Sequence, residues 1–595
     1  VQVLIQGLQH LNRAMHDDIV CVEMFPEERC VAPSSLVLHD EGVAGDVAEE
    51  NEEDVVSGAS TLPAGRTHPV VCRTSLNRCV LLQFGPLPWT VNALNKSTDS
   101  TALKSRHVQM TLWCHVPVVY RLPSHNVSDT CDCGDKEMET EVLLLEHNVP
   151  HQPFSQAVLA CLPPPTFSIT AEKDQAGRED LRALSICSVD PPGCTDIDDA
   201  LHCKPLDNGN TEVGVHIADV SYFIRPGNAL DEEASLRGTT VYLCEKNINC
   251  FTTRHFILSF LTTSRMNNDN LILAWAWIRR GHCVIARTPW FTRGVFIVSP
   301  QASLTYAEAQ LMMDDAGRKD PVTSSLCGLN SLAKILKQRR IQNGALILAS
   351  PEVRFHMDSE THDPIDLQTK ELKETNSMVE EFMLLANISV AERIVGEFPE
   401  CALLRRHPAP PPSNYDILVK AVKSKNIEIQ VDSAKALAES LDRAAVPGAP
   451  PYLNTLLRIL ATRCMMQAIY FCSGMEPDTH HYGLATAIYT HFTSPIRRYI
   501  FFLLNFSKRS YKQKQQQLCN NLNYRHKMAQ YAQCSSVAFH TPLFFKSKGV
   551  VSEEGFVLFV RKNAVLVLIP KYGLEGTVFF DSKDLKLNVT FDEEV

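Results

Sequence analysis

The sequence lacks any uninterrupted run of about 18 apolar residues, the length that a membrane-spanning helix requires. Its longest apolar stretches, such as residues 499–504, have the length of a segment of a core helix. It also lacks the charged, apolar and small-residue pattern of a signal peptide. We therefore expect a protein of the cytosol or nucleus, without a membrane partner.

Paired cysteine motifs are missing too. The chain has 20 cysteines, but none forms a Cys-x-x-Cys pair and their spacing does not repeat. This pattern disfavours a zinc ribbon or a disulfide framework and predicts reduced thiols inside the cell. P-loop, zincin, nucleophile-elbow and Gly-x-Gly-x-x-Gly patterns are absent as well, which disfavours NTPase, zinc-protease, serine-hydrolase and dinucleotide-binding functions.

The excess of positive charge that often marks nucleic-acid-binding proteins is also lacking. With 57 Lys and Arg against 68 Asp and Glu, the formal net charge is −11. However, residues 40–54 hold eight acidic side chains and no basic one, so the rest of the chain carries only −3. Net charge therefore neither supports nor excludes a nucleic-acid partner.

What the sequence does contain is a dense cluster of carboxylates. Within ten residues that include no Lys or Arg lie four aspartates, Asp190, Asp196, Asp198 and Asp199. Two unit charges about 4 Å apart repel by roughly 4 kcal/mol at an effective dielectric near 20, so a folded cluster needs a cation or bound protons. Because hard divalent cations prefer carboxylate oxygens, the segment predicts a magnesium site. An exposed acidic loop or a calcium site is the alternative, although the Gly and distal Glu of a calcium loop are absent.

The residues around the cluster predict its local structure. An apolar, β-branched run precedes Asp190, and a Pro-Pro-Gly turn follows it at 191–193. Asp190 should therefore end a strand, with the other three aspartates just past the turn. If that second piece is extended, Asp196 and Asp198 share one face and Asp199 points away.

Several segments together carry a family resemblance. Residues 190–201, 213–223 and 489–499 are similar to the ribonuclease II (RNB) family of 3′-to-5′ exoribonucleases. Residues 376–387, 404–412 and 555–580 most resemble the branch of that family that forms the catalytic subunit of the eukaryotic RNA exosome. The resemblance extends over 137–248, 301–499 and 518–580.

The resemblance implies a processive exoribonuclease that uses two Mg²⁺ ions to degrade single-stranded RNA to 5′-nucleotides. It implies a role in RNA decay and rRNA processing, with the exosome core as partner, in the nucleus, including the nucleolus, and in the cytoplasm. No segment resembles the N-terminal PIN domain with which this branch docks on the exosome, which leaves docking open.

The resemblance also assigns catalytic roles to individual residues. The four aspartates would bind metal, and Asp198 would in addition orient the attacking water. Arg497 would clamp the scissile phosphate, because a guanidinium fork fits phosphate oxygens. On sequence alone, Arg497 is equally well explained as a surface arginine after Pro495.

RNA-binding roles follow in the same way. Tyr242 would stack on the terminal base, and either Glu380 or Glu381 would contact the 3′-terminal nucleotide. Arg498 is the weaker candidate for a phosphate contact. Without the resemblance, Tyr242 fits a core position and the two glutamates fit a solvated helix face.

The expected architecture is multidomain α+β, with a mixed α/β catalytic domain flanked by β-barrel OB-fold domains. The expected domains are 1–64 (a partial cold-shock-like OB domain with an acidic loop), 65–165 (a divergent second OB-like region), 166–517 (the RNB catalytic domain) and 518–595 (a helical connector and a truncated C-terminal OB-fold domain). Periodicity predicts helices over 331–342, 377–395, 415–424, 433–445 and 452–471, and strands over 212–224 and 556–580.

Two segments depart abruptly from the family pattern, at 249–300 and 499–518. We interpret them as exon-boundary or gene-model errors, which sequencing of the transcript would test. Because they adjoin an intact aspartate cluster, a second hypothesis is a catalytically impaired, RNA-binding exosome-associated protein. A third, remote one is a calcium-stabilised scaffold.

Overall fold

The computed structural model describes most of the chain beyond residue 135. The described residues are 22–23, 73–74, 136–162, 179–192, 194, 197–222, 224, 226–250, 270–279, 290–296, 298–349, 353–358, 363–369, 373–423, 425–444, 452–499, 512–561 and 563–580. They belong to two compact units, one spanning 143–551 and one made of 1–142 with 552–595. None of the described helices combines the length and apolarity needed to cross a membrane.

Several predicted features lie outside the described residues. They include the acidic stretch 40–54, nearly all of the OB domain expected at 1–64, and nearly all of residues 65–135 in the OB-like region expected at 65–165. Of residues 1–135 the structure describes only the strands β1 (Val22–Glu23) and β2 (Arg73–Thr74), which pair antiparallel. The predicted domain boundaries stay predictions.

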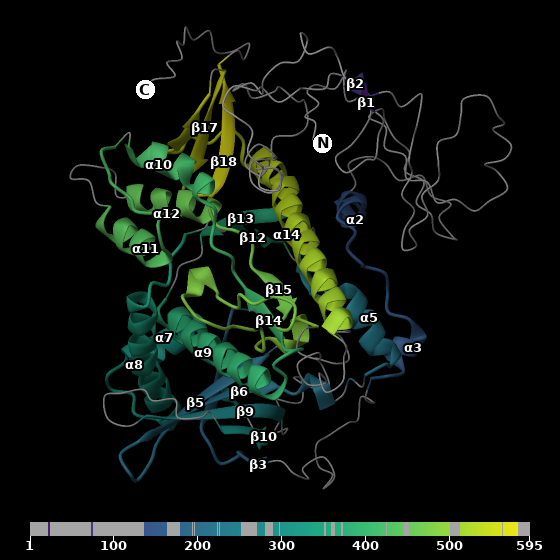
Figure 1. The fold of residues 1–595 in the computed structure, drawn as a ribbon, viewed down its shortest axis with the longest axis vertical. Coiled ribbons are helices and arrows are strands. Elements are labelled where there is room, and N and C mark those ends of the chain that lie inside the picture. The colour runs from purple at the N-terminus through teal and green to yellow at the C-terminus, as the bar shows by residue number, and fades with distance from the viewer. Residues whose placement is uncertain are drawn as a thin grey trace, which may run out of the picture. The chain divides into compact units, whose positions relative to one another are not determined.

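A seven-stranded sheet lies at one end of the larger unit, at the bottom of Figure 1. Its strands, in spatial order, are β11 (Val298–Thr305), β4 (Ile186–Asp190), β5 (Asp199–Pro205), β6 (Thr211–Ala218), β9 (Asn270–Arg279), β10 (Trp290–Phe296) and β3 (Glu179–Asp180). β11 pairs parallel with β4 and β10 parallel with β3, whereas the other pairs are antiparallel. The divergent segment 249–300 thus contributes β9, β10 and the first residues of β11 to this sheet.

Three helices follow the sheet in sequence and pack with it. They are α7 (Tyr306–Asp314), α8 (Pro321–Gln342) and α9 (Glu374–Glu397). α8 begins ten residues before the predicted start at 331, because the Asp320 side chain accepts a hydrogen bond from the Thr323 N–H and caps the helix. The fully buried Phe382 of α9 and Leu326 of α8 belong to the same hydrophobic core as Ile217 of the sheet.

A second layer of elements follows α9 along the chain. It contains the helices α10 (Asp416–Lys423), α11 (Ala434–Arg443) and α12 (Leu453–Arg463) and the paired strands β14 (Leu403–Arg406) and β15 (Ile469–Cys472). The prediction of one helix over 452–471 was wrong at its end. α12 stops at Arg463, and the β-branched and aromatic run from Ile469 pairs with β14 instead.

The 37-residue helix α14 (Lys512–Lys548) runs beside β15 (Figure 1). Asn523 of α14 accepts a hydrogen bond from the Tyr470 N–H at 2.7 Å and donates one to the Tyr470 carbonyl at 2.9 Å. Gln516, two turns earlier, accepts from the Cys472 N–H at 3.1 Å. Two amide side chains of one helix face thereby satisfy the open edge of a two-stranded sheet.

The remaining described elements are shorter. In the larger unit they are α3 (Gln156–Leu159), α5 (Ala229–Arg237), β7 (Val241–Tyr242), β8 (Asn247–Ile248), β12 (Val353–Met357) and β13 (Pro364–Thr369), with α2 (Lys136–Glu146) leading into it. In the smaller unit, β16 (Phe556–Val560), β17 (Ala564–Ile569) and β18 (Leu574–Phe579) form an antiparallel meander. The strands predicted within 556–580 are confirmed.

A close contact inside the seven-stranded sheet gives a test of this packing. His202 of β5 lies opposite Gly214 of β6, and its Nδ1 is 2.7 Å from Nε2 of the buried His216. A Cβ at position 214 would lie 2.2 Å from Cε1 of His202, closer than any real contact.

We predict that Gly214→Ala lowers the free energy of unfolding by about 1–3 kcal/mol, because the added methyl group overpacks the sheet. Gly396→Ala in α9 is the matched control, since a Cβ there meets nothing within 4 Å. Denaturant unfolding monitored by circular dichroism measures both. Equal stability of the two variants would contradict the packing described.

Candidate active site

The turn between β4 and β5 carries the predicted aspartates. Asp190 is the last residue of β4, as predicted, and Asp199 is the first residue of β5. The Cys194 N–H donates to the Pro191 carbonyl at 3.1 Å inside the turn. Asp196 lies outside the described residues.

Asp198 is held from two sides. Its carbonyl accepts a hydrogen bond from the Ala218 N–H at 3.0 Å, which fixes its backbone against the end of β6. Its buried carboxylate accepts one at Oδ1 from the Ile496 N–H, also at 3.0 Å, across 298 residues of sequence. Oδ2 lies 4.0 Å from Nε of Arg497. The sequence prediction that Asp198 and Arg497 share one site is therefore consistent with the geometry.

The charges of Asp190 and Asp199 both act on Tyr306, the first residue of α7. Burial raises the pKa of Asp199 to about 6, although the neighbouring Arg497 and Arg498 favour its ionised form. Burial, followed by the charges of Asp199 and Asp190, raises the pKa of Tyr306 to about 12. Both carboxylates thus act on one phenol. Sequence reasoning missed Tyr306, because a single tyrosine after a strand carries no spacing signal.

The donors at this turn suit a hard cation. Mg²⁺ prefers carboxylate oxygens as ligands. Burial disfavours the ionised form of Asp199, and a bound divalent ion would offset that cost. Among the residues whose positions are described, which exclude Asp196, no three His, Cys, Asp or Glu side chains gather closely enough to hold a metal. The two Mg²⁺ ions stay a prediction.

Arg497 belongs to the 3₁₀ turn η8 (Pro495–Arg497). Its Nη2 donates to Oγ of Ser494 at 2.9 Å, and its side chain is 41% exposed. Burial alone would lower the pKa of Arg497, but the adjacent Tyr242 and Asp198 outweigh this effect and raise it. Arg497 therefore stays charged beside the Asp198 carboxylate and the Tyr242 hydroxyl.

The backbone holds Tyr242 next to this turn. The Thr240 N–H donates to the Arg497 carbonyl at 3.1 Å, and the Tyr499 N–H donates to the Gly238 carbonyl at 3.0 Å. The strand β7, which contains Tyr242, thus starts from a segment fixed to η8. The structure brings together Asp198, Arg497 and Tyr242, three residues that the sequence assigned to one site.

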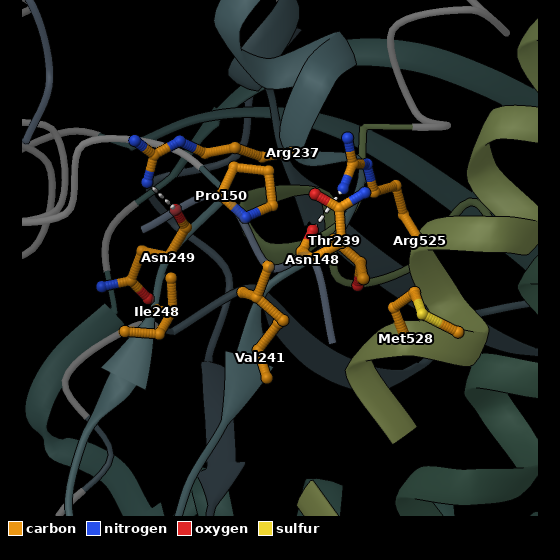
Figure 2. Close-up of a pocket in the computed structure, with 10 residues that line it drawn as sticks. Asn148, Pro150, Arg237, Thr239, Val241, Ile248, Asn249, Arg525 and Met528 are labelled. Atoms are coloured by element: carbon orange, nitrogen blue, oxygen red, sulfur yellow. Dashed lines mark hydrogen bonds between the residues drawn. The ribbon is translucent and has the colours of Figure 1, made fainter. Parts of the chain in front are cut away.

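A cavity lies behind the same segment, lined in part by Thr239 and Val241 (Figure 2). Arg525 donates to the Asn148 carbonyl at 2.6 Å on one side, and Arg237 lines the other (Figure 2). Its volume of about 10 Å³ has room for at most a single water. We regard it as a packing gap that backs β7, not as a ligand site.

Arg498 forms a hydrogen bond within its own loop. Its Nη1 donates to the Thr493 carbonyl at 3.1 Å, and burial lowers the pKa of its guanidinium, with a further contribution from Arg497. Its other electrostatic neighbours are Tyr470, Tyr489 and Arg405. The hydrogen bond to Thr493 gives Arg498 a role in holding the loop. Its contact with RNA stays a prediction.

The two glutamates of α9 differ sharply. Glu381 is 3% exposed and forms an ion pair at 2.6 Å with Arg340 of α8. Glu380 is 56% exposed and lies 3.3 Å from the same guanidinium. Glu381 therefore joins two helices, whereas Glu380 has the freedom to meet a ligand.

Comparison with known proteins identifies the family. The RNB domain model matches residues 178–500, more than half of the chain, and an S1 domain model matches residues 551–595. The chain belongs to the RNB family. The predicted fold class is confirmed, with a mixed α/β RNB domain and an S1 domain of the OB-fold type.

Full-length relatives support the branch within the family. The chain is 58% identical to "Exosome complex exonuclease RRP44" of Mus musculus over 628 residues, which cover 100% of this chain and 64% of the relative. It is 42% identical to "Exosome complex exonuclease RRP44 homolog A" of Arabidopsis thaliana, covering 98% of this chain and 67% of the relative. The chain thus spans about two thirds of the length of these curated relatives.

Solved structures share the fold at low identity. The apo form of Mycoplasma genitalium RNase R matches with a TM-score of 0.64 at 19% identity, covering 75% of this chain and 70% of that one. Yeast Ssd1, described as a pseudonuclease, matches with a TM-score of 0.60 at 21% identity, covering 78% of this chain and 59% of that one. One fold therefore accommodates proteins named as a nuclease and as a pseudonuclease.

The unequal burial of Glu380 and Glu381 generates a prediction. Glu381→Gln should lower the free energy of unfolding by about 3 kcal/mol, because it leaves the guanidinium of Arg340 without its buried counter-ion. Glu380→Gln should change it by less than about 1 kcal/mol, since exposed ion pairs contribute little. Thermal and urea unfolding of the two variants measures the difference, and the reverse order would contradict the assigned roles.

Proposed function

We propose that this chain is a 3′-to-5′ exoribonuclease that hydrolyses single-stranded RNA processively to 5′-nucleotides. The observation that carries the proposal is the carboxylate of Asp198, which accepts the Ile496 N–H while its second oxygen faces the guanidinium of Arg497. A fixed carboxylate beside a fixed cation suits a reaction in which water attacks a phosphodiester. Membership of the RNB family supports the same chemistry.

The carboxylates of Asp190, Asp196, Asp198 and Asp199 would hold two Mg²⁺ ions, which supply a nucleophilic water and neutralise charge on the phosphate. The Asp198 carboxylate, fixed at Oδ1 by the Ile496 N–H, would orient the attacking water. Arg497 donates from its guanidinium to the non-bridging phosphate oxygens, an interaction that strengthens as negative charge develops.

The end of the RNA is recognised by shape and stacking. Tyr242, anchored beside Arg497, offers an aromatic face to the terminal base, which accepts any sequence. Of the two glutamates, the exposed Glu380 is the better candidate for contacting the terminal nucleotide, because Glu381 is engaged by Arg340. A site of this kind degrades RNA without base-specific readout.

We infer the partner and the location from the names of the relatives. Two relatives are named as exosome complex exonucleases, so we carry the exosome core to this chain as a proposed partner. The proposed location is that of the exosome, in the nucleus, the nucleolus and the cytoplasm. Copurification with core subunits from a cell extract tests the partner.

A second candidate is a catalytically impaired RNA-binding protein. The observation that motivates it is that the segments 249–300 and 499–518 depart from the family pattern beside an intact aspartate cluster. Because a fold alone does not separate the two candidates, only turnover decides between them.

We predict magnesium-dependent release of nucleoside 5′-monophosphates from a 5′-labelled single-stranded RNA. Asp198→Asn should slow this release by about 10²- to 10⁴-fold, since the carboxylate no longer orients the water. RNA affinity in a filter-binding assay should be retained. Asp366→Asn, which changes an exposed aspartate of β13, is the matched control and should keep full activity.

Each other outcome of this assay has a meaning. Unmutated protein that binds RNA but releases no nucleotide with Mg²⁺ would establish the second candidate. Thermal stabilisation by Ca²⁺ without any turnover or RNA binding would establish a calcium-stabilised scaffold.

A further inference from the structure

One buried side chain, Asn387 of α9, holds the loop that leads to Arg497. Asn387 is 2% exposed. Its Oδ1 accepts hydrogen bonds from the Phe492 N–H at 2.7 Å and the Thr493 N–H at 3.0 Å. Its Nδ2 donates to Oη of Tyr489 and to Oγ1 of Thr493, both at 3.1 Å.

These four contacts use the full hydrogen-bonding capacity of one amide, two acceptor positions and two donors. The orientation of the amide is also fixed, because two backbone N–H groups converge on one atom and only the oxygen can accept them. A buried polar group whose hydrogen bonds are all formed holds its partners firmly in place. The partners here are all in the loop 489–493, more than 100 residues further along the chain.

The loop continues directly into the site. Thr493, bound by Asn387 through its N–H and hydroxyl, also accepts a hydrogen bond from Arg498 at its carbonyl. The next residue, Ser494, has φ 58° and ψ 55°, a left-handed conformation that is unfavourable without glycine. Such a conformation persists only where the chain is held on both sides of it.

The two sides of Ser494 are held by different parts of the fold. Asn387 fixes the preceding residues from α9, and Asp198 fixes the following Ile496 N–H from the start of β5. The turn between them directs the Arg497 side chain toward the carboxylate. Loss of the first anchor would let Ser494 relax and would move Ile496 and Arg497 together.

We propose that Asn387 is a positioning residue of the active site, which acts through the loop 492–497 to place the Ile496 N–H and the Arg497 guanidinium against Asp198. The test by cleavage rate rests on the proposed exoribonuclease function. The test by amide hydrogen exchange does not. Asn387 itself touches neither the RNA nor the metal ligands in this account.

The kinetic experiment compares Asn387→Ala with Asn387→Asp under single-turnover conditions. Asn387→Ala should slow cleavage by about 10²-fold, the effect expected for a displaced catalytic group, while RNA affinity changes by less than about threefold. Asn387→Asp should recover most of the rate, because carboxylate oxygens still accept both N–H groups and the two hydroxyls can rotate to donate.

A matched control separates positioning from stability. Asn454, at the start of α12, also anchors backbone, since its Nδ2 donates to the carbonyls of Leu441 and Ala444. Asn454→Ala should lower the melting temperature while leaving the cleavage rate unchanged. An equal loss of rate in Asn454→Ala and Asn387→Ala would overturn the proposal.

A double variant tests whether Asn387 acts through Arg497. If it does, Asn387→Ala should slow Arg497→Ala by clearly less than the 10²-fold that it costs the unmutated protein, because one of the two groups that Asn387 positions is already gone. Multiplication of the two separate losses would overturn the proposal.

Amide hydrogen exchange supplies a readout that needs no activity. In Asn387→Ala, peptides that cover residues 492–497 should exchange faster, while peptides from the other end of α9 keep their protection. Unchanged exchange over 492–497 would overturn the positioning role even in an active enzyme. If the unmutated protein fails to cleave RNA, the proposed function is lost and this exchange result alone decides the role of Asn387.

Discussion

The hydrogen bond from the Ile496 N–H to the Asp198 carboxylate is the contact on which the candidate site depends. It joins the residue before β5 to a loop that follows β15, across 298 residues of sequence. The turn after β4 presents the carboxylate, whereas α9 and β7 hold the loop on its two flanks. Each of these elements is stabilised by its own packing. Together they place the Asp198 carboxylate beside Arg497.

The acidic and basic side chains of the site come from different parts of the fold. The carboxylates of Asp190, Asp198 and Asp199 lie on the sheet side, and the guanidinium groups of Arg497 and Arg498 lie on the loop side. Behind the arginines, burial and the nearby Arg498 and Arg405 keep the pKa of His491 well below its usual range. This histidine is therefore neutral near pH 7 and hydrogen-bonded to the Tyr470 hydroxyl at 2.6 Å, as a structural residue.

Local features were predictable from the sequence and distant pairings were not. The end of β4 at Asp190 followed from an apolar run and a Pro-Pro-Gly turn, and the meander from β16 followed from β-rich runs. The strand at Ile469 was mistaken for helix, because a short apolar run after a helix fits either structure until a partner strand is known. Tyr306 and Asn387 were missed, since a single residue becomes informative only when folding supplies its neighbours. Family resemblance, rather than periodicity, placed Arg497 near Asp198.

The distance of 298 residues between Asp198 and Ile496 also has a consequence for biosynthesis. At roughly 5–20 residues per second, a ribosome adds the loop about 15–60 s after the aspartates have been made. During that interval the growing polypeptide carries the acidic half of the site without the basic half. The candidate site therefore cannot assemble until synthesis has passed Ile496.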